Sequence, residues 1–254
     1  MLVCENQIIL IKIFLCIVSI IFTQGCTDDV VVNPGECVNE LSVKEHKEGW
    51  KSLFDGVSLK DWRSYGESEV NSGWGVESGC LTRLGWGGDL ITKKKYRNFE
   101  LRLDWRISDA GNSGIFIRGD EEGSSISQTA HEMQVLDNFS HWDRHDPKHR
   151  AGAYYDMIAP DHDTSKPVGF WNRVYILANE EHVEFWLNGK KTASFDQGSD
   201  YWNNLYRESK FSDRPRYGSL FSGLIGLQDH WDKVWYRAIR IRILDKGVLP
   251  VGPN

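Results

Sequence analysis

The sequence predicts an all-β protein built as a sandwich of antiparallel sheets. Residues 99–107 alternate between apolar and charged side chains along their whole length, which is the period of a half-buried strand. Residues 171–178 and 183–187 are two further strand-like segments, and a polar turn joins them. No long segment carries the 3.6-residue apolar period of a helix, so we expect little helix. A length of 254 residues suits one sandwich domain with a sizeable core.

Residues 99–107 form the most clearly patterned strand of the chain. Their apolar side chains fall on one face and their charged side chains on the other. The apolar set is Phe99, Leu101, Leu103, Trp105 and Ile107. Later in the chain, Asn188-Gly189 follows a predicted strand and is a pair that tolerates the left-handed backbone of a tight hairpin. Successive hairpins of this kind indicate antiparallel sheets.

Residues 234–243 are expected to form a strand that closes a sheet. Its second half alternates apolar and basic residues: Ile239, Arg240, Ile241, Arg242 and Ile243. In the segment before it, Gln228 and His230 have the spacing to project together from the end of a strand, as in a binding site. The alternative is a Gln228 that satisfies backbone groups and a His230 packed against a neighbouring tryptophan.

Residues 1–26 resemble a lipoprotein-type signal peptide. Lys12 precedes an apolar run over residues 13–22 that is too short to span a bilayer as a mature helix. Thr23-Gln-Gly-Cys26 resembles a lipobox, and the acidic pair after it resembles the export signal of bacterial surface lipoproteins. We therefore expect an exported outer-membrane lipoprotein, anchored through a lipid on Cys26 and facing the periplasm or the outside. A cleaved signal peptide without a lipid is the alternative.

The remaining chain divides into three predicted parts. We expect residues 27–48 to be a tether, residues 49–246 to be the folded domain and residues 247–254 to be a tail, because the first part has neither a helical nor a strand period. Cys37 and Cys80 are candidates for a disulfide, and the alternative is two small buried thiols. A net charge of −6 without a basic block argues against a nucleic-acid partner.

Two long polar segments, residues 138–149 and 197–219, interrupt the strands and are expected to frame a cleft. The first contains His145, Asp146 and His149, which are candidates for the ligands of a divalent metal. Their spacing is not diagnostic, and the alternative is a set of solvated loop side chains. No other cofactor is evident.

Residues 131–138 contain the first candidate for chemistry. On a regular strand Glu132 and Gln134 share one face, while His131, Met133 and Val135 share the other. The segment resembles the acidic strand of laminarinase-type glycoside hydrolases, which need two carboxylates across the scissile bond. An amide stands in the middle position here, so ordinary retaining hydrolysis is disfavoured and Glu132 is a candidate acid or base. The alternative is an ion pair between Glu132 and an arginine of the sheet.

Residues 111–119 are expected to form a turn that leads into a strand. Gly114, Phe116 and Arg118 would share a face of that strand, which would bring Arg118 near Glu132. A guanidinium there can hydrogen-bond a sugar oxygen or stabilise an enolate. A structural ion pair is the alternative.

Seven segments carry a resemblance to a known family. They are Gly49-Trp-Lys-Ser-Leu-Phe-Asp-Gly56 with Leu59-Lys-Asp-Trp62, Gly111-Asn-Ser-Gly-Ile-Phe-Ile-Arg118, Glu132-Met-Gln-Val-Leu-Asp-Asn138, Ala151-Gly-Ala-Tyr-Tyr155, Phe170-Trp-Asn172, Trp186-Leu-Asn-Gly189 and Gly226-Leu-Gln-Asp-His230. In this order they resemble the bacterial 3-keto-disaccharide hydrolases, also described as 3-keto-α-glucoside 1,2-lyases and 3-keto-2-hydroxyglucal hydratases. The resemblance implies a concanavalin A-like jelly-roll sandwich. The family often has Glu at the position of Phe170 and Gly at that of Trp231.

The resemblance also implies a reaction and a set of site residues. The substrate would be a 3-keto-glucoside, cleaved by elimination across C1 and C2 followed by hydration, and a sugar 3-dehydrogenase would supply the ketone. The implied catalytic residues are Glu132, His230 and Arg118; the implied substrate-binding residues are Gln134, Gln228, Tyr155, Asn112, Asp137 and Trp231. Two other functions compete with this one: a lectin-like module that binds carbohydrate without turnover, and a conventional β-glucan hydrolase on the same fold.

Overall fold

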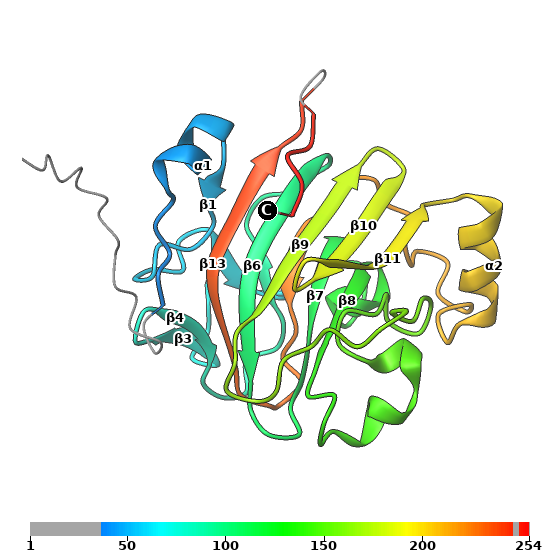
Figure 1. Cartoon of the computed structure of the whole chain (residues 1–254), viewed down its shortest axis with the longest axis horizontal. Helices are drawn as coiled ribbons and strands as arrows, with labels where there is room; N and C mark the ends of the chain where they lie inside the picture. The colour runs from blue at the N-terminus through cyan, green and yellow to red at the C-terminus, as the bar shows by residue number, and fades with distance from the viewer. Residues whose placement is uncertain (1–36, 246–248, 254) are drawn as a thin grey trace, which may run out of the picture. The chain divides into compact units, whose positions relative to one another are not determined.

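The structure, a computed structural model, describes residues 37–245 and 249–253, and it is built from two antiparallel sheets (Figure 1). In the larger sheet the strand order is β11-β10-β9-β6-β13-β4-β3, and β1 also pairs with β13. In the smaller sheet the order is β2-β5-β12-β7-β8. The predicted all-β sandwich of antiparallel sheets is therefore confirmed.

The strands of the larger sheet are β1 (Lys51–Ser52), β3 (Trp74–Glu77), β4 (Cys80–Arg83), β6 (Phe99–Ile107), β9 (Asn172–Asn179), β10 (His182–Leu187), β11 (Lys190–Asp196) and β13 (Val234–Ile243). Those of the smaller sheet are β2 (Trp62–Ser64), β5 (Leu90–Thr92), β7 (Asn112–Gly119), β8 (His131–Leu136) and β12 (Leu224–Leu227). The helices are short: α1 (Val43–Glu48), α2 (Asp200–Glu208) and the 3₁₀ turns η1 (Ile126–Gln128), η2 (Trp142–His145) and η3 (Pro147–His149).

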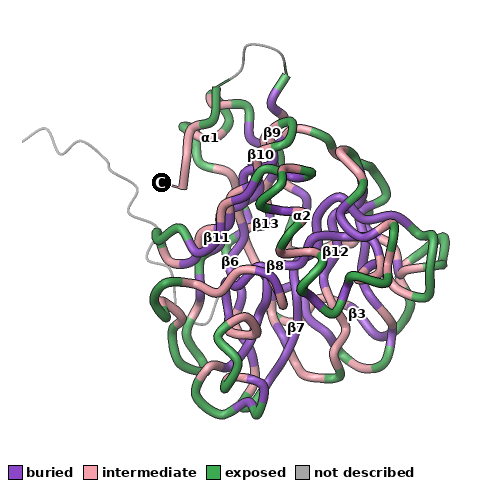
Figure 2. The backbone as a smooth tube through the Cα atoms, turned by 90° about the vertical axis from the view of Figure 1, so that its right-hand side faces the viewer, coloured by how far each residue is buried: buried purple, intermediate pink, exposed green. Residues whose placement is uncertain are grey.

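One hydrophobic core lies between the sheets. The apolar face of β6 is buried against it, as the alternation of the sequence predicts. The smaller sheet contributes alternate residues of its strands, among them Ile115 and Ile117 of β7 and Met133 and Val135 of β8. The strands are accordingly buried along most of their length, and the connecting loops carry most of the exposed residues (Figure 2). The other face of the smaller sheet carries a second, smaller cluster of buried apolar residues, which includes Phe116 and Ile126.

The hairpin between β10 and β11 forms at the predicted place. Asn188 and Gly189 both have a positive φ, 50° and 79°, which is the backbone that a two-residue turn requires between twisted strands. Asn188 further anchors the turn, because its side-chain amide donates to the backbone oxygen of Thr164 over 2.7 Å. The Asn188-Gly189 turn thus fixes how β10 and β11 pair next to it.

Strand β13 has the predicted bounds but not one uniform alternation. Val234 and Tyr236 are buried in its first half, whereas Ile239 and Ile241 are buried in its second. The phase changes at Ala238, which has a φ of 52° and lies where the pairing with β6 shifts register. A bulge of this kind turns the next side chains to the opposite face.

The predicted tether is wrong for residues 37–48, which belong to the folded unit. Cys37 forms a disulfide with Cys80 of β4 across a Cα–Cα distance of 5.2 Å. Ser42 caps α1 in a capping box with Glu45. Asn39 donates to the backbone oxygen of Gly79 over 2.8 Å. This helix is too short to show an apolar period, so its sequence resembles a linker.

The predicted signal peptide and the first part of the tether, residues 1–36, lie outside the described residues. Residues 249–253 of the predicted tail return to the larger sheet, where the backbone N–H of Val251 donates to Glu100 over 2.8 Å. The polar segment 197–219 contains α2, capped by Ser199, where we predicted a loop. None of the described helices is long and apolar enough to cross a membrane.

Candidate active site

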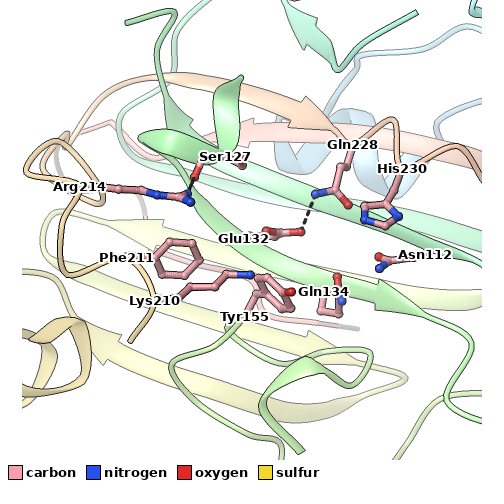
Figure 3. A pocket seen from close by; sticks show the side chains of 10 residues that line it. All are labelled: Asn112, Ser127, Glu132, Gln134, Tyr155, Lys210, Phe211, Arg214, Gln228 and His230. Atoms are coloured by element: carbon pink, nitrogen blue, oxygen red, sulfur yellow. Dashed lines mark hydrogen bonds between the residues drawn. The ribbon is translucent and has the colours of Figure 1, made fainter. Parts of the chain in front are cut away.

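A small polar pocket lies on the face of the smaller sheet that points away from the core (Figure 3). Its volume is about 160 Å³, which favours recognition of one sugar ring rather than a long chain. The residues that line it are Asn112, Ser127, Glu132, Gln134, Tyr155, Lys210, Phe211, Arg214, Gln228 and His230. Six of them were predicted from the sequence: Asn112, Glu132, Gln134, Tyr155, Gln228 and His230. The structure brings these six together from four separate parts of the chain.

Strand β8 supplies the floor of the pocket. Glu132 and Gln134 face the pocket, whereas Met133 and Val135 pack into the core, so the predicted division of faces is confirmed. Because β8 is the edge of the smaller sheet, its outer backbone groups are free to pair with a following segment. The backbone N–H of Tyr155 donates to the oxygen of Glu132 over 3.0 Å, and this pairing carries the tyrosine to the pocket wall.

Glu132 is buried at the centre of the pocket, with 3% of its surface exposed. Its Oε1 accepts a hydrogen bond of 3.2 Å from the side-chain amide of Gln228. Burial raises the pKa of Glu132 to about 8, although the nearby charge of Lys210 lowers it. The carboxylate lies directly over Gly114, where a Cβ atom would come within 2.4 Å of Oε1. A glycine is thus needed on β7 to leave room for this acid.

Gln228 and His230 extend from the end of β12 and are fixed by backbone contacts with β7. The backbone N–H of Gln228 donates to the oxygen of Gly114 over 2.9 Å, and the hydroxyl of Ser113 donates to the oxygen of Gln228 over 2.8 Å. The buried Asp89 accepts the backbone N–H of Asp229 over 3.1 Å. Burial raises the pKa of Asp89 to about 6. These contacts hold the two predicted side chains against the pocket.

Lys210, Phe211 and Arg214 form the wall that the sequence did not predict as part of the site. The ammonium of Lys210 lies 3.9 Å from the centre of the Tyr155 ring, and burial lowers its pKa. Arg214 reaches over Phe211 and donates to the backbone oxygen of Ser127 over 3.5 Å. A cluster of basic and aromatic residues in a long polar segment was the available signal, but nothing in the sequence connects that segment to β8.

Three amide oxygens of the pocket have no hydrogen-bond partner among the described residues. They belong to Asn112, Gln134 and Gln228, and all three are buried. A buried polar atom without a partner costs free energy, and a ligand hydroxyl is a suitable donor for such an oxygen. The pocket therefore presents acceptors to a polyhydroxylated ligand, a central acid and two cations.

Comparison with known proteins identifies the family of this chain. Residues 49–242 match the 3-keto-alpha-glucoside-1,2-lyase-like domain family. The chain belongs to this family. It is 33% identical to a 3-keto-disaccharide hydrolase of Bacteroides thetaiotaomicron over 82% of this chain and 83% of that protein.

Crystal structures of members of the same fold come from Parabacteroides distasonis. One proposed glycosyl hydrolase superposes with a TM-score of 0.77 at 31% identity, over 82% of this chain and 99% of the other. A second superposes with a TM-score of 0.62 at 28% identity, over 77% of this chain and 99% of the other. The sandwich of this member of the lyase-like family is therefore shared with solved structures along nearly their whole length.

Arg118 does not lie on the face of Glu132, so that prediction is wrong. Its φ is 57°, and the pairing between β7 and β12 shifts register beside it, which rotates its side chain away from the pocket. The guanidinium is fully buried, and it donates to Gln197 over 2.8 Å and to the backbone oxygen of Glu180 over 2.6 Å. Burial lowers the pKa of Arg118 to about 10. Within this family member the arginine supports the fold beside the site.

Asp137 and Trp231 also lie outside the pocket lining. Asp137 accepts the backbone N–H groups of Ala110 and Phe139, at 2.9 and 3.0 Å, and so fixes the turn after β8. Trp231 is exposed and lies beside His230, with 5.4 Å between the ring centres. Asp137 is therefore placed to shape the loop rather than to touch a ligand in this pocket.

The three metal candidates do not come together as a set, although Asp146 lies 3.9 Å from His149. The ring nitrogens of His149 already contact Asp143, at 2.8 Å, and Asp156, at 3.1 Å. Although burial opposes it, these carboxylates raise the pKa of His149. The part of the chain that the structure describes contains no group of three or more His, Cys, Asp or Glu side chains arranged to hold a metal ion. His145, Asp146 and His149 therefore do not fit a metal as a set.

Proposed function

We propose that this domain cleaves 3-keto-glucosides, including 3-keto-disaccharides, by elimination across C1 and C2 followed by hydration. Membership of the lyase-like family and the similarity to a 3-keto-disaccharide hydrolase support a glycosidase-type enzyme that acts on carbohydrate. The observation that carries the elimination mechanism is the content of the pocket: among its described lining residues, Glu132 is the only carboxylate.

A single carboxylate suits elimination better than displacement. Glycoside hydrolysis by displacement uses two carboxyl groups, about 5–5.5 Å apart in retaining enzymes and about 6.5–9.5 Å apart in inverting ones. A ketone at C3 makes the C2 proton acidic, so one base can begin the reaction. The C2–H and C1–O bonds break, the C1=C2 bond forms, and the leaving oxygen takes a proton. Water then returns a proton to C2 and hydroxyl to C1, so the net reaction is hydrolysis.

The order of side chains along the pocket matches the order of the reacting atoms. The segment that carries Lys210 and Arg214 enters from one side, Glu132 lies at the centre, and His230 lies toward the other side (Figure 3). In a 3-keto-glucoside the corresponding order is O3, C2 and O1. We assign the cations to the enolate oxygen at C3, Glu132 to the C2 proton and His230 to the leaving oxygen. We thus assign to Lys210 and Arg214 the role that we had predicted for Arg118.

Two partners belong to the same proposal. The C3 ketone requires an enzyme that oxidises the C3 hydroxyl of the glycoside, such as a sugar 3-dehydrogenase. The proposal also includes export of the enzyme to the outer membrane with a lipid anchor at Cys26, and the disulfide between Cys37 and Cys80 supports an oxidising compartment.

The decisive experiment follows the proton at C2. The purified protein is incubated in D₂O with a 3-keto-glucoside and with its unoxidised parent, and the products are analysed by mass spectrometry and NMR. Elimination and hydration place one deuterium on C2 of the released 3-keto-glucose at the first turnover, whereas direct displacement leaves the C2 proton in place. A control without enzyme measures spontaneous exchange beside the ketone.

The other outcomes select other functions. Cleavage of the unoxidised parent would select a conventional glucan hydrolase, and binding without product would select a lectin-like module. A parallel incubation with a chelator tests the predicted divalent metal, since turnover that disappears and returns with added Mg²⁺, Ca²⁺ or Zn²⁺ would establish it.

A further inference from the structure

Two exposed tryptophans stack on each other beside the pocket. Trp86 is 70% exposed and Trp231 is 66% exposed, and their ring planes lie 17° apart with 6.2 Å between centres. Large apolar side chains at this exposure cost solvation free energy unless a ligand or partner covers them. Trp231 also contacts the His230 ring, which lines the pocket. The aromatic surface therefore continues directly from the site.

The buried carboxylate of Asp229 connects the two segments that carry Trp86 and Trp231. Asp229 accepts the backbone N–H groups of Gly87 and Gly88, at 2.9 and 3.0 Å, and that of Trp231 at 3.1 Å. It also pairs with the side chain of Arg83, and none of its own side chain is exposed. Asp229 thus joins the loop of Trp86 to the turn of Trp231, so the backbone that carries both rings is held in place before any ligand binds.

The backbone around both rings is constrained as well. Trp231 has a φ of 64°, a left-handed conformation that a bulky residue rarely adopts. Next to Trp86, a Cβ atom at Gly73 would come within 2.5 Å of the Gly87 backbone, so the two loops meet too closely for larger residues. A strained backbone such as that of Trp231 persists only where surrounding contacts enforce it, and such strain is typical of ligand-binding sites.

We propose that Trp86 and Trp231 form a stacking platform that selects glycosides whose leaving group contains a ring. This inference rests on the proposed function, because it places the leaving group at the His230 end of the pocket and the ketone at the Lys210 end. The shared chemistry of the ligand is a ring with an apolar face, which either a second sugar or an aromatic aglycone supplies. The leaving oxygen then lies near His230 while its ring covers the tryptophans.

The test compares three 3-keto-glucosides, with methyl, phenyl and glucosyl leaving groups. The variants are Trp231→Gly, which replaces the strained residue by one that accepts a positive φ, and Trp86→Ala. Each variant should lower the ratio of kcat/KM for a ring-bearing substrate to that for the methyl substrate by about 3- to 10-fold. Since the ratio is compared between proteins, differences in intrinsic leaving-group reactivity cancel. Tyr201→Ala, which removes an exposed ring from α2, is the matched control and should keep the wild-type ratio.

The possible outcomes distinguish a failure of the stacking-platform proposal from a failure of the proposed function. A fall for the glucosyl substrate alone assigns a sugar, and a fall for the phenyl substrate alone assigns an aromatic aglycone. Unchanged ratios for both, with turnover intact, overturn the platform and leave the proposed function standing. Absence of turnover for all three overturns the proposed function instead. The platform is then judged by tryptophan fluorescence during titration with phenyl, methyl and glucosyl glucosides, and ring-independent binding overturns it.

Discussion

Glu132 is placed where its neutral form is favoured, and this is a useful property for a base that must act near neutral pH. A carboxylate with a raised pKa is a stronger base toward a proton next to a ketone, and burial raises the pKa of Glu132 to about 8. The cation of Lys210 opposes part of this increase. We therefore expect kcat/KM for a 3-keto-glucoside to rise with pH through a limb near 8, where the base becomes ionised.

Glu132→Gln should lower turnover strongly and make the protein more stable. Loss of a general base lowers kcat by about 10²- to 10⁴-fold. The stability effect follows from linkage: between the ordinary pKa of 4.5 and about 8 the unfolded chain loses a proton that the folded chain keeps, so wild-type stability falls as pH rises through this window. The amide removes that cost, and the variant should gain on the order of 1–3 kcal/mol at pH 7.

Thermal unfolding at pH 4 and pH 8 measures the stability effect. The difference in melting temperature between the variant and wild type should be small at pH 4 and largest at pH 8. Glu40→Gln, a change at an exposed glutamate, provides the control and should show no such trend. A Glu132→Gln protein that still exchanges the C2 proton would remove Glu132 from the role of base.

Gly114→Ala tests whether the position of the carboxylate matters as much as its presence. The new methyl group would meet Glu132 Oε1 at 2.4 Å, and the flexible carboxylate, rather than the strand, is the part that can move. Because a displacement of about 1 Å can cost about 10²-fold in rate, kcat should fall by roughly that factor with little change in melting temperature. In Gly114→Ala/Glu132→Asp, the shorter acid avoids the methyl group, so the two losses should be less than multiplicative. Multiplicative losses would indicate that the glycine acts elsewhere.

The residues of the site differ in how far sequence could predict them. Glu132 and Gln134 follow from strand parity alone, because β8 is regular and a period of two leaves no choice of face. The same alternation predicts that Arg118 faces the pocket. Its left-handed backbone instead rotates the side chain away. The amino-acid sequence of a strand does not indicate a positive φ at an arginine. Alternation along a strand therefore predicts the face of a side chain only where no bulge interrupts the strand.

At the scale of elements, regular strands were predictable and the second polar segment was not. Strand β6 buries the face that its alternation predicts, whereas the phase change at Ala238 within β13 depends on pairing with β6. The segment 197–219 contains α2, which was expected to be loop, and it then carries Lys210 to the pocket. That placement depends on long-range contacts such as the hydrogen bond of 2.7 Å from the backbone N–H of Lys210 to Asp156.

Lys210→Met should show what this segment contributes to catalysis. The change keeps the length of the side chain and removes its charge, so an enolate at C3 loses one stabilising cation, and kcat should fall by about 10²-fold. Removal of the cation also raises the pKa of Glu132, since Lys210 lowers it in the wild type. The ascending limb of the pH profile of kcat/KM should therefore move to higher pH.

The pH profile separates this role from a purely structural one. Lys190→Met, at an exposed position on β11, is the matched control and should preserve both the rate and the profile. If Lys210→Met lowered kcat without moving the limb, the lysine would not be electrostatically coupled to Glu132 in the working enzyme.

At the scale of the whole described unit, the segment 37–48 extends the sandwich rather than leading to it. The disulfide between Cys37 and Cys80 joins it to β4, the side-chain oxygen of Asn39 accepts the backbone N–H of Ala238 over 2.9 Å, and Glu45 pairs with Arg240. Composition suggested a tether because the segment has no apolar period of its own, and its contacts are made by single polar residues with distant strands. This attachment is on the larger sheet, whereas the pocket is on the smaller one.

Cys37→Ser/Cys80→Ser should therefore weaken the fold without weakening catalysis. A cross-link between residues 43 positions apart restricts the unfolded chain, and its loss typically costs about 2–4 kcal/mol. For a domain of this size that corresponds to a fall in melting temperature of about 5–15 °C by calorimetry. At 25 °C the variant should keep the wild-type kcat and C2 deuterium incorporation, because neither cysteine lines the pocket. The wild-type protein with its disulfide reduced should have the melting temperature of the variant.

A variant that loses activity while still folded would show that the larger sheet controls the geometry of Glu132, and would contradict the independence of the two sheets.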